Sequence, residues 1–417
     1  MRCVRAVGYA GFLSFGCTLA VHNAAAESAR YSVVIDGSQP VTARVVLTLP
    51  QSADRASAVL VSGAAPLNVN PQINDVRCDG RPVDEDAGRW RLPLGCKEAT
   101  WSVRIARPGP RGILASDQQS VAMQGGWYLF SEPSSLLRLA SEPLGGSVIS
   151  FSGPAVRSED IQLQPRNKGP SFFVLADAPR VSVRDGALTL TYFGDDLQAV
   201  QRLVEPSKHL EGLVYLRRVM GPSTRRINEL KVVWLQIAND GNVYGGAAGN
   251  DVFLVNYAAD PPPEQAVKPF IITLHEQFHQ IDPGGTNRPQ WVSESLAQYY
   301  ALKAALHVSG DDPRYVNEWT RWFRKAEKES GKLLDAQQRV RNKDFSAYKL
   351  FYSRGSMFWR DVEAALKRNG QEDGLDPVLP IILGATFGPD ASLPVEVLRA
   401  LSGIPESELT TLIETYL

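Results

Sequence analysis

Two histidines four residues apart place the strongest constraint on this chain. His275 and His279 frame a glutamate in the pattern H-E-x-x-H. Residues four apart lie on one face of an α-helix, so both imidazoles can bind the same zinc ion. Glu276, beside the first histidine, can then act as a general base on a water molecule. The alternative is a helix whose two histidines lie on its core face without binding a metal.

The residues around this motif favour a helix over Glu264–Ile281. The chain contains only 5 His, so a chance match to the pattern is rare. Apolar residues recur at helical spacing and would bury one face of the segment. These residues are Phe270, Ile271, Leu274, Phe278 and Ile281.

A third candidate ligand, Glu294, follows His279 in the sequence. Between the two, a polar stretch with Pro and Gly predicts a turn, so a second helix over Gln290–Val308 can run beside the first. Three protein ligands leave one position of a tetrahedral zinc ion open for water, which is the catalytic arrangement. A glutamate on an amphipathic helix is otherwise usually a solvated surface charge. We therefore predict one zinc ion (Zn²⁺) per chain, held by His275, His279 and Glu294.

These motifs resemble those of the gluzincin metallopeptidases, and in particular the aminopeptidase N and glycyl-aminopeptidase branches. In those branches a second helix carries W-L-x-E-G-[FL]-A-x-Y, and its Glu is the third zinc ligand. Trp291-Val-Ser-Glu-Ser-Leu-Ala-Gln-Tyr299 is similar to that motif, with Ser295 where the family has Gly. Residues 351–358 resemble the family segment Y-x-K-G-x-x-[LV], whose Tyr stabilises the tetrahedral intermediate. The resemblance implies that role for Tyr352, with Arg354 in place of Lys.

The resemblance also extends to a glycine-rich stretch before the zinc motif, Tyr244-Gly-Gly-Ala-Ala-Gly-Asn250. It implies that Gly245 and Gly246 let a strand approach the substrate backbone. The family's exopeptidases carry a Glu in this stretch that binds the free amine of the substrate. That Glu is missing here, which argues against strict aminopeptidase specificity.

Alternating patterns dominate the first half of the chain. Val41–Leu49, Trp101–Ile105 and Leu188–Tyr192 are typical of short strands, and turn signals such as Asp79-Gly80 separate such segments. The pattern predicts an all-β, sandwich-like N-terminal domain over residues 27–192.

The pattern of the second half is mainly helical. Buried strands are expected in a small sheet at about residues 230–260, and helices at about 263–417, including Pro313–Glu329 and Gly355–Arg368. The predicted fold class is therefore α+β, with several domains. The resemblance implies that residues 193–417 form a thermolysin-like catalytic domain.

The first 26 residues have the features of a secretory signal peptide. Arg2 and Arg5 are followed by an apolar run too short for a membrane anchor, and then by three alanines that end at Ala26. We expect cleavage near Ala26 and export to the periplasm or the medium.

Export gives the two remaining cysteines, Cys78 and Cys96, an oxidising environment. They flank a turn-rich stretch, and we predict a disulfide between them. The alternative, a pair of metal ligands, lacks the close C-x-x-C spacing of such sites.

Charge excludes two classes of partner. Lys plus Arg (44) nearly equals Asp plus Glu (45), and no block of like charges stands out. We expect neither nucleic acid binding nor stable membrane insertion. The expected partner is a peptide or protein substrate, and the sequence leaves the oligomeric state open.

Together these features predict an exported zinc-dependent peptidase that hydrolyses peptide bonds through a metal-activated water. Two alternatives stay open: a non-catalytic, zinc-stabilised peptide-binding protein, and a zinc hydrolase acting on a non-peptide substrate.

Overall fold

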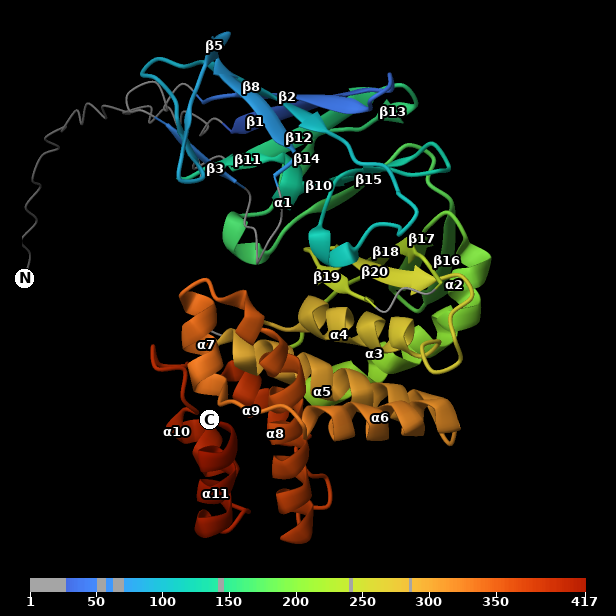
Figure 1. Cartoon of the computed structure of the whole chain (residues 1–417), viewed down its shortest axis with the longest axis vertical. Helices are drawn as coiled ribbons and strands as arrows, with labels where there is room; N and C mark the ends of the chain where they lie inside the picture. Colours follow the sequence, from blue (N-terminus) through green and yellow to red (C-terminus); the bar gives the residue numbers. More distant parts are fainter. Residues whose placement is uncertain (1–27, 51–57, 63–70, 142–145, 240–242, 285–286) are drawn as a thin grey trace, which may run out of the picture.

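The computed structural model describes residues 28–50, 58–62, 71–141, 146–239, 243–284 and 287–417 (Figure 1). The predicted signal peptide, residues 1–26, lies outside the described residues. The expected mixed α+β class is confirmed, with strands concentrated in the N-terminal part and helices in the C-terminal part.

The N-terminal part is built around a large sheet of the order β13-β12-β1-β2-β8-β4-β5, in which β14 also pairs with β12. Apart from the parallel pair β1–β12, its neighbouring strands are antiparallel. The strands alternate buried and exposed residues, so one face packs on the core. They are β1 (Ala29–Asp36), β2 (Thr42–Thr48), β4 (Ile73–Cys78), β5 (Arg81–Pro82), β8 (Glu98–Arg104), β12 (Ser147–Gly153), β13 (Val156–Arg157) and β14 (Ile161–Leu163).

Two smaller sheets complete this part of the chain. One has the order β11-β3-β7-β6 and the other β15-β10-β9. Their strands are β3 (Val59–Ser62), β6 (Glu85–Asp86), β7 (Arg89–Arg91), β9 (Val121–Ala122), β10 (Tyr128–Ser131), β11 (Leu137–Leu139) and β15 (Phe172–Leu175).

The two cysteines of this region are joined by the predicted disulfide. Cys78, at the end of β4, and Cys96, just before β8, have Cα atoms 5.8 Å apart. The bond ties two neighbouring strands of the large sheet together at one end.

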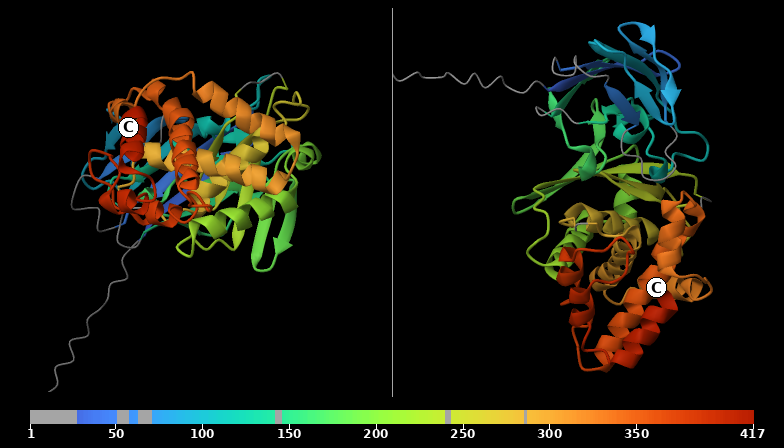
Figure 2. Two further views of the ribbon diagram at one scale, coloured as in Figure 1. Left: turned by 90° about the horizontal axis from the view of Figure 1, so that it is seen from below. Right: turned by 90° about the vertical axis from the view of Figure 1, so that its left-hand side faces the viewer.

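A five-stranded sheet lies between the N-terminal strands and the helices (Figures 1 and 2). Its strand order is β16-β17-β18-β20-β19. β17, β18 and β20 run parallel, while β16 and β19 are antiparallel edge strands. β16 comes before the expected domain boundary at residue 192 and β17 ends just after it, so this sheet crosses that boundary. The strands are β16 (Arg180–Asp185), β17 (Leu188–Phe193), β18 (Glu229–Ile237), β19 (Gly246–Ala248) and β20 (Val252–Ala258).

Both faces of this sheet are buried, and the residues of β18 divide between them. Val232 and Trp234 belong to the core that the sheet shares with the helices. Val233 and Leu235 belong to a second core, shared with β9, β10 and β15. The alternation follows from the period of two along a strand. A sheet covered on both sides explains why β20 is buried throughout.

The helices pack below this sheet in the view of Figure 1, with α4 and α3 nearest to it. None of the described helices combines the length and the apolar character needed to cross a bilayer. They are α2 (Leu197–Leu203), α3 (Pro206–Met220), α4 (Lys268–Ile281), α5 (Gln290–Ser309), α6 (Pro313–Ala326), α7 (Leu333–Arg341), α8 (Lys349–Arg368), α9 (Leu379–Gly384), α10 (Val395–Ala400) and α11 (Glu406–Tyr416). The N-terminal part adds the one-turn helix α1 (Glu132–Ser135) and short 3₁₀ turns, one of which is η2 (Ala115–Asp117).

Two helix starts differ from the expected ones. α4 begins at Lys268 rather than at Glu264, because Pro269 has no backbone N–H and suits only the first turn of a helix. α8 begins at Lys349 rather than at Gly355. The glycine lies within the helix, where tertiary packing overrides its low helix propensity.

Close contacts between helices explain why glycine occupies two positions inside them. A Cβ on Gly212 of α3 would lie 2.4 Å from a methyl carbon of Leu274 on α4. A Cβ on Gly355 of α8 would lie 2.4 Å from the Cβ of Ser295 on α5. The Ser295 hydroxyl also accepts a hydrogen bond from the indole Nε1 of Trp359 at 2.7 Å. The glycines therefore set how closely α3, α4, α5 and α8 pack.

We predict that Gly355→Ala destabilises the protein by about 1–3 kcal/mol, because the added methyl group overpacks the α5–α8 contact. Urea denaturation of wild type and variant measures this change in the free energy of unfolding. Combining it with Ser295→Gly removes the atom that the methyl group meets. The double variant should therefore lose less stability than the two single variants added together, and strict additivity would contradict the contact.

Candidate metal centre

The three predicted metal ligands converge from two neighbouring helices. α4 carries His275 and His279 on one face, and α5 carries Glu294. The two Nε2 atoms are 3.1 Å apart, and Oε2 of Glu294 lies 3.3 Å from Nε2 of His275 and 3.5 Å from that of His279. The structure thus brings together residues that the spacing of the sequence had linked.

These separations match the donor set of a tetrahedral zinc site. With zinc–ligand bonds of 2.0–2.1 Å, two ligand atoms of a tetrahedron lie about 3.3 Å apart. The three measured separations bracket that value. Two imidazole nitrogens and one carboxylate oxygen are also ligands that zinc prefers. The residues therefore fit a zinc ion with three protein ligands.

The charges in and around the ligand trio, His275, His279 and Glu294, favour a positive charge at its centre. Burial acts against a charged imidazole, but Glu294, Glu276 and Asp282 outweigh it and raise the pKa of His279 to about 9. Burial likewise acts against a charged carboxylate, yet the two histidines hold the pKa of Glu294 well below its ordinary value. Glu294 thus stays ionised, as a metal ligand must.

Glu276 lies close to these three residues and against the edge strand β19. Burial raises its pKa, although the two histidines and the backbone N–H of Ala248 oppose the shift. A Cβ on Gly246 would lie 2.4 Å from Oε1 of Glu276. Only glycine fits at that position, so the predicted glycine makes room for the candidate general base.

Tyr348 is a functional candidate that the sequence prediction missed. Its hydroxyl donates to Oε1 of Glu294 at 2.7 Å, and this oxygen is not the one facing the histidines. Such a bond orients a ligating carboxylate. Tyr348 is the N-cap of α8 and lies four residues before Tyr352, so the i, i+4 rule could have placed both on one face.

Tyr352, for which the resemblance implies an oxyanion-stabilising role, lies close to the first histidine. Its ring centroid is 5.6 Å from that of His275. Burial and the charge of Glu294 raise its pKa well above the ordinary value, so the phenol stays protonated. Its ring also packs on that of Tyr348, with the two centroids 5.6 Å apart.

A buried polar chain fixes the back of α4. Oε1 of Gln277 lies 2.7 Å from Nε2 of His209 on α3, and Nδ1 of His209 lies 2.9 Å from the hydroxyl of Tyr192 on β17. Burial lowers the pKa of His209 to about 4, so this histidine is neutral near pH 7. The chain links the motif helix to the sheet, and no local sequence pattern pointed to it.

A cavity of about 710 Å³ opens beside the trio. Its lining includes five of the site residues predicted from the sequence: Gly245, Gly246, His275, Glu276 and Tyr352. Ser116 of η2 also lines it, so the N-terminal part of the chain contributes to its wall.

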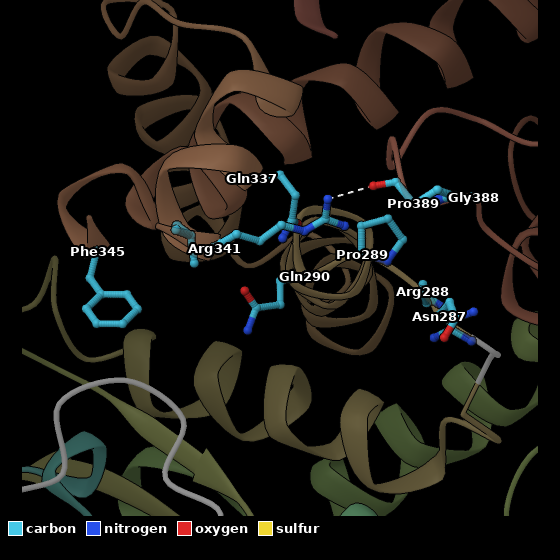
Figure 3. A pocket seen from close by; sticks show the side chains of 10 residues that line it. Asn287, Arg288, Pro289, Gln290, Gln337, Arg341, Phe345, Gly388 and Pro389 are labelled. Atoms are coloured by element: carbon cyan, nitrogen blue, oxygen red, sulfur yellow. Dashed lines mark hydrogen bonds between the residues drawn. The ribbon is translucent and has the colours of Figure 1, made fainter. Parts of the chain in front are cut away.

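A second hollow, of about 720 Å³, lies at the start of α5 (Figure 3). Arg341 donates to the carbonyl of Pro389 across it at 2.6 Å. Its described lining contains no carboxylate, imidazole or thiol. It therefore offers neither a metal ligand nor a general base.

The arrangement of elements has a counterpart among solved structures. The chain is similar to the crystal structure of an aminopeptidase N family protein from Idiomarina loihiensis, with a TM-score of 0.66 and 13% sequence identity. The similarity covers 92% of this chain and 75% of that one. At this identity the likeness concerns the fold. No protein-family model and no curated protein sequence matches the chain.

We predict that Tyr348→Phe weakens the affinity for Zn²⁺ by about 10-fold, because Glu294 loses the bond that orients it. Competition with a chromogenic chelator measures this affinity without any substrate. Tyr315→Phe is the matched control, since Tyr315 is a buried tyrosine that packs on the first turn of α4 instead. Equal affinities for wild type and both variants would contradict the orienting role.

Proposed function

We propose that this protein is an exported, zinc-dependent peptidase that holds one zinc ion per chain and cleaves internal peptide bonds. The observation that carries the proposal is the convergence of His275, His279 and Glu294 within 3.5 Å, beside a cavity lined by Glu276 and Tyr352. The fold shared with an aminopeptidase N family protein supports it. The predicted signal peptide and the disulfide support export.

Each residue of the site has a distinct task in peptide hydrolysis. Zinc held by His275, His279 and Glu294 would polarise the substrate carbonyl and lower the pKa of a water molecule. Glu276 takes the proton of the attacking water and passes it to the nitrogen of the leaving amine. Burial raises its pKa, and a raised pKa suits a carboxylate that accepts and then donates a proton.

Tyr352 stabilises the charge that develops on the carbonyl oxygen. Its phenol stays protonated and can donate a hydrogen bond to that oxygen. Such a donor acts mainly in the transition state, where the oxygen carries more charge than in the substrate.

The edge strand β19 offers a place for the substrate backbone. It pairs with β20 on one side only and ends the described sheet order. An extended peptide can add to such an edge through main-chain hydrogen bonds. Gly245 and Gly246 have no side chain that would obstruct this approach.

The missing amine-binding glutamate supports cleavage of internal bonds. A buried ammonium group needs a carboxylate partner, because an unpaired buried charge costs several kcal/mol. The strand facing Glu276 offers only Gly246, Ala247 and Ala248.

Our first functional prediction concerns the general base. Glu276→Gln should keep about one zinc ion per chain but lose about 10²- to 10⁴-fold in turnover, because the amide cannot accept a proton. His279→Ala and Glu294→Ala should lose the metal itself. Elemental analysis and a peptide-library digest measure the two effects. A wild type with no zinc would refute the metal site, whereas zinc binding without cleavage would favour the binding-protein alternative.

The second functional prediction concerns specificity. Acetylation of the substrate N-terminus should not abolish cleavage, because no residue of β19 supplies a carboxylate for the free amine. Mass spectrometry of one peptide, digested in the free and in the acetylated form, tests this. Stepwise removal of residues from the free form alone would show that the enzyme is an aminopeptidase.

A further inference from the structure

The cavity beside the metal centre carries more positive charge than the mechanism uses. Its apolar surface comes from residues such as Ile272, Leu302 and Trp322. Its lining also includes four cationic side chains that come from three helices, and none of them belongs to the motifs. They are Lys268 of α4, Arg321 and Lys325 of α6, and Lys349 of α8.

Three of these cations lack a carboxylate partner. Arg321 is paired with Glu318. Among the described residues, no carboxylate lies within salt-bridge distance of Lys268, Lys325 or Lys349. The other two carboxylates of the lining are Glu276 and Glu329.

The two remaining carboxylates do not balance these lysines. Glu276 is the candidate general base, and its pKa is raised by burial. Glu329 accepts a hydrogen bond from the hydroxyl of Ser353 at 2.7 Å. Neither carboxylate forms an ion pair with the three lysines, which therefore line the cavity without a carboxylate partner.

Lys268 is the lysine most affected by the other positive charges. It is half-buried, and its Nζ lies 5.2 Å from the ring centroid of Tyr244, another residue of the lining. Burial and the charges of Arg321 and Lys325 lower its pKa, and the charge of Glu264 only partly opposes this shift. A negative group in the cavity would relieve this repulsion and would gain charge-assisted hydrogen bonds.

We propose that the cavity binds a carboxylate of the substrate through Lys268 and Lys325, so that cleavage occurs close to an acidic side chain or to a free C-terminus. The inference rests on the proposed peptidase function and adds its substrate class. Both sources present the same carboxylate, and the experiment separates them.

The test uses three peptide pools that differ in one feature. All are acetylated at the N-terminus and random in uncharged residues. The first has a central Asp and an amidated C-terminus, the second a central Asn and an amidated C-terminus, and the third a central Asn and a free C-terminal carboxylate. We expect the zinc-loaded full-length protein to cleave the first or the third pool about fivefold faster than the second, in kcat/KM. Raising the salt concentration should reduce the difference, since Lys325 and Lys349 are exposed.

Substitutions test whether the preference for the carboxylate pools depends on these lysines. Lys268→Met and Lys325→Met keep most of the aliphatic stem and remove the charge. In each variant the ratio of carboxylate pool to amide pool should fall toward one, and the amide pool serves as the internal reference. Lys328→Met is the matched control, because Lys328 is exposed, follows Lys325 closely and does not line the cavity. Its ratio should equal that of the wild type.

A binding measurement separates this inference from the proposed function. The affinities of single peptides from the three pools for the Glu276→Gln protein are measured by calorimetry. Equal cleavage of all pools, with equal affinities, would overturn the carboxylate site and leave the peptidase intact. If the wild type cleaves none of the pools, peptidase function fails. In that case tighter binding of the carboxylate peptides supports the site, and equal binding overturns it too.

Discussion

The packing of the C-terminal half depends on one cluster of polar groups. Two imidazoles and a carboxylate lie within 3.5 Å of one another and are largely buried. Burying such groups without partners is costly. Tyr348 satisfies the outer oxygen of Glu294, and the trio itself is suited to a cation. Gln277 and His209 hold the opposite side of α4. Helix packing and polar pairing therefore position the same three donor atoms.

The N-terminal part of the chain is also needed to shape the site. Asn256 of β20 is fully buried and donates to the carbonyls of Ile113 and Leu235, while its oxygen accepts from the N–H of Ala115. These bonds dock the η2 turn on the five-stranded sheet. The turn presents Ser116 to the cavity, next to Gly245. A buried amide thus joins the two halves at the place where substrate would bind.

Local patterns explain what the sequence could and could not predict. Helical spacing around His275 located α4, and the turn before Gln290 placed Glu294 beside it. Alternation over Leu188–Tyr192 predicted the strand that the structure has as β17, but it could not show that this strand joins the sheet of the helical half. Alternation does not identify pairing partners. Tyr348 could have been predicted from the sequence, since it precedes Tyr352 by one turn. The cationic lining could not have been predicted, because its residues come from three helices that only tertiary packing brings together.

In the proposed mechanism, the neighbouring rings of Tyr352 and Tyr348, 5.6 Å apart, connect catalysis to metal binding. Tyr348 donates its proton to Glu294, so that proton is committed to the carboxylate that would bind the metal. Tyr352 lies against His275, and its raised pKa keeps the phenol protonated. A substrate oxygen would accept the hydrogen bond of this phenol and would gain negative charge during the reaction. Because charge strengthens a hydrogen bond, such a bond favours the transition state more than the bound substrate.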